Sequence, residues 1–345
     1  MDFDAIERLV DEIKSIMSEA RQRVSGNINT IMISTYWEVG RIIVESEQNG
    51  KLKAQYGKRI ISELSKRLTV ELGKGYSKSN LYNMRDFYTA YPKLQMPSGK
   101  LSWSHYIELS SVKDPDARSF YEHEAVHTNW AVGELRRQID TSLFERLLLS
   151  DGQPNKEKVL ALARQGATIE KPEDILRQPY VFEFLGVREE KPILEKDLEA
   201  KLIRHMEDFL LELGRGFMFV GSQQRITVGH RHYYVDMVFY NKVLKAYVLI
   251  DLKMTDLQPE HAGQMNAYLN YYKNEVNDEG DNPPVGILLC KSSDEITAEY
   301  ALGGLSTQVF ASSYVYYIPE KEQLVNEVKA LLAQESEERV ERTDF

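Results

Sequence analysis

Two aspartates and a lysine occur where strand-forming residues would be expected. Asp236 lies within the run YYVDMVFY, and Asp251 and Lys253 end the run KAYVLIDLK. Aspartate is disfavoured in strands, so two of them in aromatic and β-branched runs require an explanation. Because side chains alternate along a strand, Asp251 and Lys253 should share a face. Two carboxylates and an ammonium group at a strand end predict metal-assisted phosphodiester hydrolysis.

The sequence around these residues resembles the YhcG-like family of the PD-(D/E)xK nuclease superfamily. The motif order is Asp236, then Asp-x-Lys at 251–253, then Gln-x-x-x-Tyr at Gln264 and Tyr268. Other similar stretches are DLEAKLIRHMEDFLLELGRGFMFVGSQQRI, PEHAGQMNAYLNYY and PVGILLC, and the N-terminal half resembles the family's leading domain in YSKSNLYNMRDFYTAYP, LSWSHYIEL and NWAVGELRRQI. The superfamily often has Glu where this chain has Asp251, and a shorter side chain alters the reach to a metal.

The resemblance implies a deoxyribonuclease that uses Mg²⁺, with Mn²⁺ as an alternative ion. Asp236 and Asp251 would ligate the metal, together with the Leu252 carbonyl, and Lys253 would stabilise the attacking hydroxide or the developing charge. In the family pattern Glu199, the Glu of DLEAKLI, would be a third carboxylate ligand. Its alternative role is that of a solvated helix carboxylate.

Three further residues are candidates for accessory roles. Gln264 and Tyr268 are one helical turn apart and would project together. In related branches such a pair positions the attacking water or the DNA strand. Gln224, in the run before Asp236, is a candidate phosphate contact.

Two alternatives to catalysis remain open from the sequence alone. Asp251 and Lys253 by themselves would also fit an ordinary surface ion pair. The chain would otherwise be a non-catalytic DNA-binding or regulatory protein that keeps the nuclease fold, although the intact set of Asp236, Asp251 and Lys253 argues against this.

The composition is that of an ordinary globular protein. The 345 residues are 42% hydrophobic and 28% charged, and this length predicts two domains. No stretch approaches the roughly 20 apolar residues of a membrane span, and the acidic start MDFDAIERLVDEIK does not fit a secretory signal. The single cysteine, Cys290, lies in the apolar run VGILLC, so we expect a buried thiol and a cytoplasmic location.

The net charge of −10 is unevenly distributed. Residues 51–78 contain eight Lys or Arg against two Glu, a local balance of +6. A helix ending at Gly73 and a second helix capped by Ser77 or Ser79 form a helix-turn-helix outline. Its candidate nucleic-acid contacts are Lys74, Lys78, Ser79, Asn80, Tyr82 and Arg85. DNA is the expected partner and RNA stays open, as does a homodimer; the alternative is a helical hairpin with a solvated basic face.

These patterns predict two folded domains of different class. We expect an all-α, helix-turn-helix-like domain over 1–165, a linker over 166–190, and an α/β nuclease domain over 191–335, followed by an acidic tail. The second domain should be restriction-endonuclease-like, with a central mixed sheet flanked by helices. Strands are expected at 217–220, 224–228, 232–240 and 245–252, between helices at 196–213 and 259–274. The acidic tail covers 336–345.

One motif points to different chemistry. His123, Glu124 and His127 match HExxH, the zinc-metallopeptidase pattern, in which two histidines share a helix face. The pattern has only three fixed positions, and Trp130 stands where the metzincin extension needs Gly. We therefore expect solvent-facing histidines, with a zinc peptidase as the remote alternative.

Overall fold

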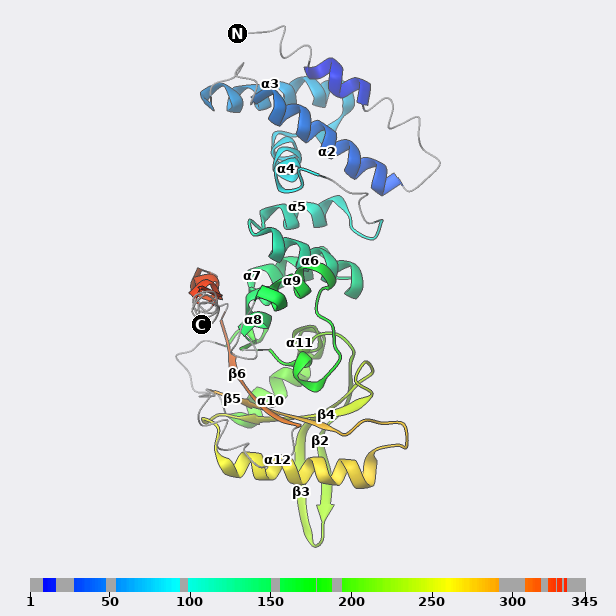
Figure 1. Cartoon of the computed structure of the whole chain (residues 1–345), viewed down its shortest axis with the longest axis vertical. Coiled ribbons are helices and arrows are strands. Elements are labelled where there is room, and N and C mark those ends of the chain that lie inside the picture. Colours follow the sequence, from blue (N-terminus) through cyan, green and yellow to red (C-terminus); the bar gives the residue numbers. More distant parts are fainter. Residues whose placement is uncertain are drawn as a thin grey trace, which may run out of the picture. The chain divides into compact units, whose positions relative to one another are not determined.

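The computed structural model describes residues 9–16, 28–47, 54–93, 99–149, 156–177, 179–187, 194–291, 308–317, 322–326, 328–330 and 332–333. The chain forms two compact units, Met1–Ile139 and Asp140–Phe345, which are treated separately below (Figure 1). This division falls earlier than the boundaries at 165 and 190 expected from the sequence, which stay a prediction. The expected acidic tail lies outside the described residues. Among the helices described, none has the length and apolar character needed to cross a bilayer.

The first unit is built from helices. α2 (Ile28–Ser46), α3 (Ala54–Leu72), α4 (Lys78–Ala90), α5 (Trp103–Ser111), α6 (Pro115–Thr128) and α7 (Val132–Asp140) follow a helical segment at 9–16. α2, α3 and α4 share a core that includes Val39, Leu64 and Met84. Gly40 lets α2 approach α4 closely, because a Cβ atom there would lie 2.1 Å from the carbonyl oxygen of Met84.

α3 and α4 form the two-helix motif expected from the sequence. Between them lies the 3₁₀ turn η2 (Lys74–Tyr76), entered through Gly73 with a φ of +100°, which favours glycine. The Ser77 hydroxyl caps α4 by accepting a hydrogen bond from the Asn80 N–H at 3.2 Å. The helix ends at Ala90, and its C-cap residue Tyr91 directly precedes Pro92.

The second unit contains a six-stranded mixed sheet. Its elements are α8 (Leu143–Leu149), α9 (Lys156–Gln165), η3 (Pro172–Ile175), β1 (Tyr180–Val181), η4 (Glu183–Leu185), α10 (Glu195–Arg204), α11 (Met206–Leu213), β2 (Phe217–Val228), β3 (Arg231–Asn241), β4 (Ala246–Lys253), α12 (Pro259–Tyr271), the π-helical segment η5 (Tyr272–Val276), β5 (Val285–Cys290) and β6 (Val309–Val315). The strand order is β1-β6-β5-β4-β3-β2. β2, β3 and β4 are antiparallel neighbours, whereas β4, β5, β6 and β1 run parallel.

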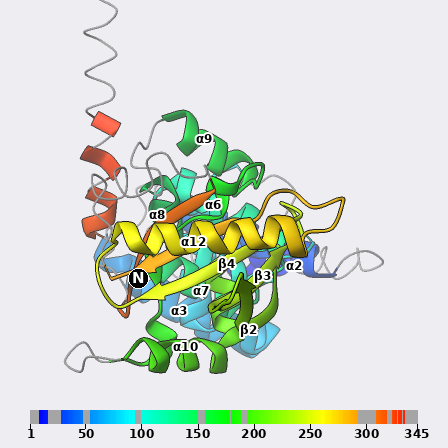
Figure 2. The ribbon, with the colours of Figure 1, turned by 90° about the horizontal axis from the view of Figure 1, so that it is seen from below.

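Helices cover both faces of this sheet. On one face, α10 and α11 pack on alternate strand residues such as Phe239, Ile250 and Ile287. On the other face, α12 packs on the intervening residues Leu249 and Leu288 (Figure 2). A central mixed sheet flanked by helices was expected, and the fold class is confirmed.

A fully buried ion pair fastens α8 to the sheet unit. Arg146 in α8 and Glu212 in α11 lie 2.5 Å apart, and their side chains are 0% and 1% exposed. Arg146 also donates to the carbonyl oxygens of Thr141 and Pro179, and Glu212 accepts from the Val181 N–H of β1. Removing one partner from such a buried pair typically costs about 3–5 kcal/mol, because the other charge is left uncompensated. Residues 141–149 are therefore an integral part of the second unit.

Candidate active site

The two predicted aspartates meet where β3 and β4 separate. These strands pair from Asn241↔Ala246 to Met237↔Ile250, and beyond that point β3 stays with β2 while β4 stays with β5. Asp236 and Asp251 are the next residues of the two strands. The Leu252 N–H, which has no β3 backbone partner there, donates to Asp236 Oδ2 at 2.8 Å. We call this arrangement the fork.

Asp251 and Lys253 form a largely buried ion pair at the fork. Asp251 is 2% exposed, and the Lys253 Nζ atom lies 2.6 Å from its Oδ2 atom. Burial and the nearby charge of Asp236 raise the pKa of Asp251 to about 7, although the Lys253 ammonium opposes this. Burial alone would lower the pKa of Lys253, but the charge and hydrogen bond of Asp251 raise it overall. Lys253 is therefore protonated at neutral pH.

Glu199 joins the fork through a glutamine that sequence reasoning missed. The Gln223 side-chain amide donates to Glu199 Oε2 at 2.8 Å and to Asp236 Oδ1 at 3.1 Å. Glu199 extends from α10 and is 8% exposed. Burial raises its pKa, the Gln223 hydrogen bond lowers it, and the charge of Asp236 raises it further.

Gln223 reaches both carboxylates because its backbone leaves the regular strand conformation. Its φ of +48° lies in the left-handed region, which is uncommon for a residue with a side chain. The expected phosphate contact, Gln224, instead turns its amide toward the Ser222 carbonyl at 3.5 Å and is exposed. One sequence signal could have identified Gln223: counting back from a tight turn at Gly229 and His230 places it opposite Asp236.

Gln264 and Tyr268 lie together on α12, as their spacing indicated. The Gln264 amide donates to the Tyr268 hydroxyl, which donates to the carbonyl oxygen of Tyr234 in β3 at 3.1 Å. Tyr268 is fully buried, and burial together with the charge of Asp251 raises its pKa to about 12. The pair thus anchors β3 two residues before Asp236.

The oxygen ligands at the fork suit a hard divalent cation. Asp251 Oδ2 is buried and, apart from the adjacent ammonium, has no hydrogen-bond partner. Within the described residues, no three acidic, His or Cys side chains gather closely enough to enclose a metal ion. Asp236 and Asp251 would therefore supply part of the ligand shell, with backbone carbonyl, water or phosphate oxygens completing it.

The candidate contacts in the first unit fall into two groups. Lys74, Lys78 and Ser79 are exposed around η2 and the start of α4. Asn80, in contrast, donates to the Gly75 carbonyl and accepts from the indole N–H of Trp103.

The other two candidates of this unit are also engaged with their neighbours. Arg85 lies 4.9 Å from the centre of the Tyr82 ring and pairs with Asp86 at 2.8 Å. The structure therefore leaves the two lysines and Ser79 as the side chains most available to a ligand.

The HExxH residues do not form a metal centre in the described parts of the chain. The His123 Nδ1 atom is hydrogen-bonded to the Ser119 carbonyl at 2.8 Å, and Glu124 is buried. The His123 and His127 rings lie 6.1 Å apart between their centres.

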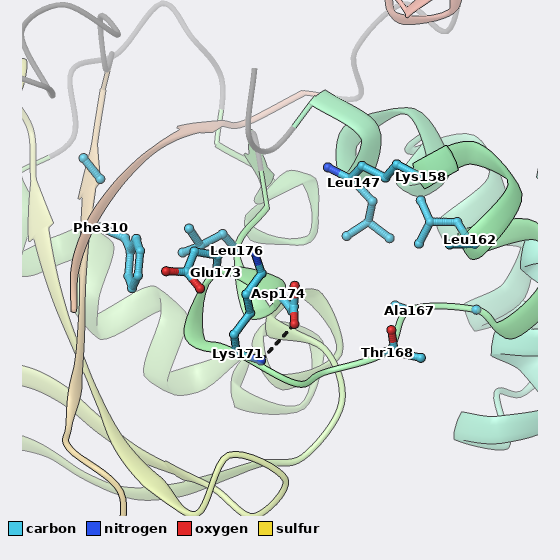
Figure 3. A pocket seen from close by; sticks show the side chains of 13 residues that line it. Leu147, Lys158, Leu162, Ala167, Thr168, Lys171, Glu173, Asp174, Leu176 and Phe310 are labelled. Carbon is cyan, nitrogen blue, oxygen red and sulfur yellow. Dashed lines mark hydrogen bonds between the residues drawn. The ribbon is translucent and has the colours of Figure 1, made fainter. Parts of the chain in front are cut away.

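A pocket of about 440 Å³ lies elsewhere in the second unit (Figure 3). It is lined by residues of α8, α9, η3 and β6, including Lys158, Asp174 and Phe310. None of the fork residues lines it. The pocket and the fork are therefore separate features of the second unit.

In the absence of metal, we expect the stability of the second unit to fall as pH rises from about 4 to about 7. The pKa of Asp251 is raised to about 7 in the folded chain and is near 4 in an unfolded one. Between these values the folded state binds more protons, so the free energy of unfolding falls with pH and levels off above the folded pKa. Asp251→Asn should flatten this slope in urea unfolding measured with EDTA. Equal slopes for the two proteins would contradict the burial penalty.

Comparisons with known proteins cover nearly the whole chain. Residues 12–146 match the DUF1016 N-terminal domain, and residues 173–329 match the YhcG PDDEXK nuclease domain. A protein of Escherichia coli (strain K12) named "Putative nuclease YhcG" is 36% identical over 355 residues, which cover 93% of each chain.

One solved structure is also similar, but weakly. It is described as a crystal structure of a repair endonuclease from Pyrococcus abyssi and is 18% identical. It covers 39% of this chain and 50% of its own, with a TM-score of 0.25 that is too low to bear on the argument. The family matches and the curated relative decide the assignment: the chain belongs to the YhcG family of PDDEXK nucleases.

Proposed function

We propose that this chain is a metal-dependent deoxyribonuclease that hydrolyses phosphodiester bonds at the fork. The observation that carries the proposal is the convergence of Asp236, Asp251 and Lys253 where β3 and β4 part. The nuclease family supports the reaction class. DNA as the substrate, and Mg²⁺ or Mn²⁺ as the ion, are the finer parts of the proposal.

Asp236 and Asp251 would hold the cation, and Glu199 would complete the acidic set through Gln223. When bound, the cation supplies positive charge to the scissile phosphate and helps to generate the nucleophile. The Leu252 N–H fixes Asp236, so that this carboxylate is oriented before substrate arrives.

Lys253 supplies the second positive charge of the site. Its side chain is 13% exposed and its ammonium group is protonated, and it would donate to the attacking water or to a phosphate oxygen. Gln264 and Tyr268 would act indirectly, since Tyr268 holds the β3 backbone at Tyr234.

The first unit would bind nucleic acid through Lys74, Lys78 and Ser79 around the start of α4. The buried cysteine, Cys290, fits a reducing, cytoplasmic location.

Asp236→Asn and Asp251→Asn should each reduce DNA cleavage by about 10³-fold or more, since a lost ligand removes several kcal/mol of charge stabilisation. Cleavage of labelled DNA with Mg²⁺, with Mn²⁺ and with EDTA measures this. Asp208→Asn is the matched control, because it removes the same charge from a carboxylate that is 45% exposed. Wild-type activity in both fork variants would overturn the site.

Gln223→Ala should lower activity by about 10- to 100-fold, the usual effect of losing a group that orients metal ligands. The deficit should shrink at high metal concentration, because the amide positions Glu199 and Asp236 and does not itself bind the cation. The control is Gln224→Ala, because the Gln224 amide contacts the Ser222 carbonyl and neither Glu199 nor Asp236. A larger loss in the control variant would restore Gln224 as the functional residue.

The double variant Lys74→Ala/Lys78→Ala should raise KM for DNA more than it lowers kcat. Each lost phosphate contact should also flatten the slope of log K against log salt by about 0.9. Lys93 and Lys113, exposed lysines outside the two-helix motif, provide a control with the same charge change. Equal affinity in the two double variants would indicate that η2 and α4 serve another purpose.

A further inference from the structure

The hairpin between β2 and β3 extends well past the fork. Its register continues from Gln224↔Val235 through Arg225↔Tyr234, Ile226↔Tyr233 and Thr227↔His232 to Val228↔Arg231. Figure 1 shows the two strands projecting beyond α12. We call residues 222–235 the arm. Its two strands start at the fork, and the turn that joins them is exposed.

The arm is cationic in an acidic protein. Residues 222–235 include Arg225, His230, Arg231 and His232 and no Asp or Glu, whereas the whole chain has a net charge of −10. All four of these side chains are exposed. Neither arginine has an acidic partner within the part of the chain that the structure describes. Such guanidinium groups are suited to bidentate contacts with phosphate.

The two faces of the arm differ. Ile226 and Val235 are buried and, with Tyr233, pack in the core beneath α12, which holds the arm to the domain. The opposite face carries the pairs Arg225↔Tyr234 and Thr227↔His232, and the Thr227 hydroxyl is hydrogen-bonded to the His232 ring at 3.0 Å.

Strand alternation places His232 and Tyr234 on the same face of β3 as Asp236. Tyr234 is 51% exposed despite its large ring. A row of exposed basic and aromatic side chains thus leads away from the catalytic carboxylate.

We propose that the arm binds the backbone of duplex DNA beside the phosphate that is cleaved. Arg225 and its cross-strand neighbour Tyr234 would contact a phosphate and the adjoining sugar on the face that carries Asp236. Arg231, on the other face of β3 and next to the turn, would contact a phosphate at the end of the arm. The inference rests on the proposed function for the position of the scissile phosphate, but the charge and exposure of the arm are independent of it.

The length of the arm sets how far it reaches. Arg231 lies five positions before Asp236, which corresponds to about 17 Å along a strand. Successive residues on one face are about 7 Å apart, close to the rise of two nucleotides in duplex DNA. Lying along the duplex, the arm would contact phosphates as far as about five nucleotides from the cleaved bond.

The test compares two charge-neutralised forms of the full chain. Arg225→Gln/Arg231→Gln removes the arm's arginines, and Lys242→Gln/Lys245→Gln removes two exposed lysines at the turn between β3 and β4, at the other end of the sheet. Binding of a short fluorescent DNA duplex, of its single strand and of the matching RNA is measured in EDTA at salt concentrations from about 50 to 200 mM. Cleavage of the same duplex by the wild type is measured with Mg²⁺ and, separately, with Mn²⁺ and other divalent metals.

We expect the arm variant to bind the duplex at least about 10-fold more weakly than the wild type. The slope of log K against log salt should flatten by about 1.8, which corresponds to the loss of two phosphate contacts. The lysine control should match the wild type. Arg225→Lys/Arg231→Lys, which keeps the charge, should recover the salt slope. Unchanged urea unfolding midpoints would show that the arm variant is folded.

Other results separate the arm from the proposed chemistry. If the arm variant kept the affinity and the salt dependence of the wild type, the proposed role of the arm would be refuted, whereas the proposed cleavage at the fork would be unaffected. Binding of single strands or RNA without duplex binding would also overturn it. Weakened binding by the arm variant, with no wild-type cleavage in any divalent metal, would support the arm and refute the nuclease proposal.

Discussion

The candidate site depends on a single backbone event, the separation of β3 from β4 after the pair Met237↔Ile250. If the two strands stayed paired, the Leu252 N–H would be directed at β3 backbone. Because they part, that N–H binds the Asp236 carboxylate instead, and the charge of Asp236 lies close enough to Asp251 to raise its pKa. The same separation sends β3 onward with β2 as the arm, so the carboxylates and the proposed DNA contact arise from one change in strand pairing.

Keeping Asp251 at the fork carries an energetic cost that the rest of the domain must offset. Ionisation of Asp251 is disfavoured because this residue is 2% exposed and lies beside the charge of Asp236. The Lys253 ammonium offsets only part of this penalty. Around it, β5 is buried along its whole length and the Arg146–Glu212 pair fastens α8 to the domain. A rigid core of this kind can hold mutually repelling carboxylates in place before a cation arrives.

The chemistry of the site could be predicted from sequence more fully than its supporting contacts. Aspartates within runs of strand-forming residues are conspicuous because aspartate is disfavoured there. The order of strand-like runs and helices predicted the central sheet. The two runs at 217–220 and 224–228 form one strand, β2, with a register shift between Phe219 and Gly221. The pairing register counted from the hairpin turn places Gln223, and not Gln224, opposite Asp236, whereas the side-chain chemistry of two adjacent glutamines cannot distinguish them. Likewise, Asn80 has the chemistry of a base contact, yet Trp103, distant in sequence, already occupies it.

The net charge of this chain is a poor guide to the proposed interaction with DNA. Salt at physiological concentration screens charges beyond about 8 Å, so a phosphate responds mainly to the groups that lie next to it. At the fork those groups are Lys253 and the arm's arginines, set against carboxylates that a cation would neutralise. An acidic surface elsewhere then favours release and discourages unproductive binding. The uneven charge is therefore compatible with a nuclease whose affinity resides in two small basic regions, around η2 and along the arm.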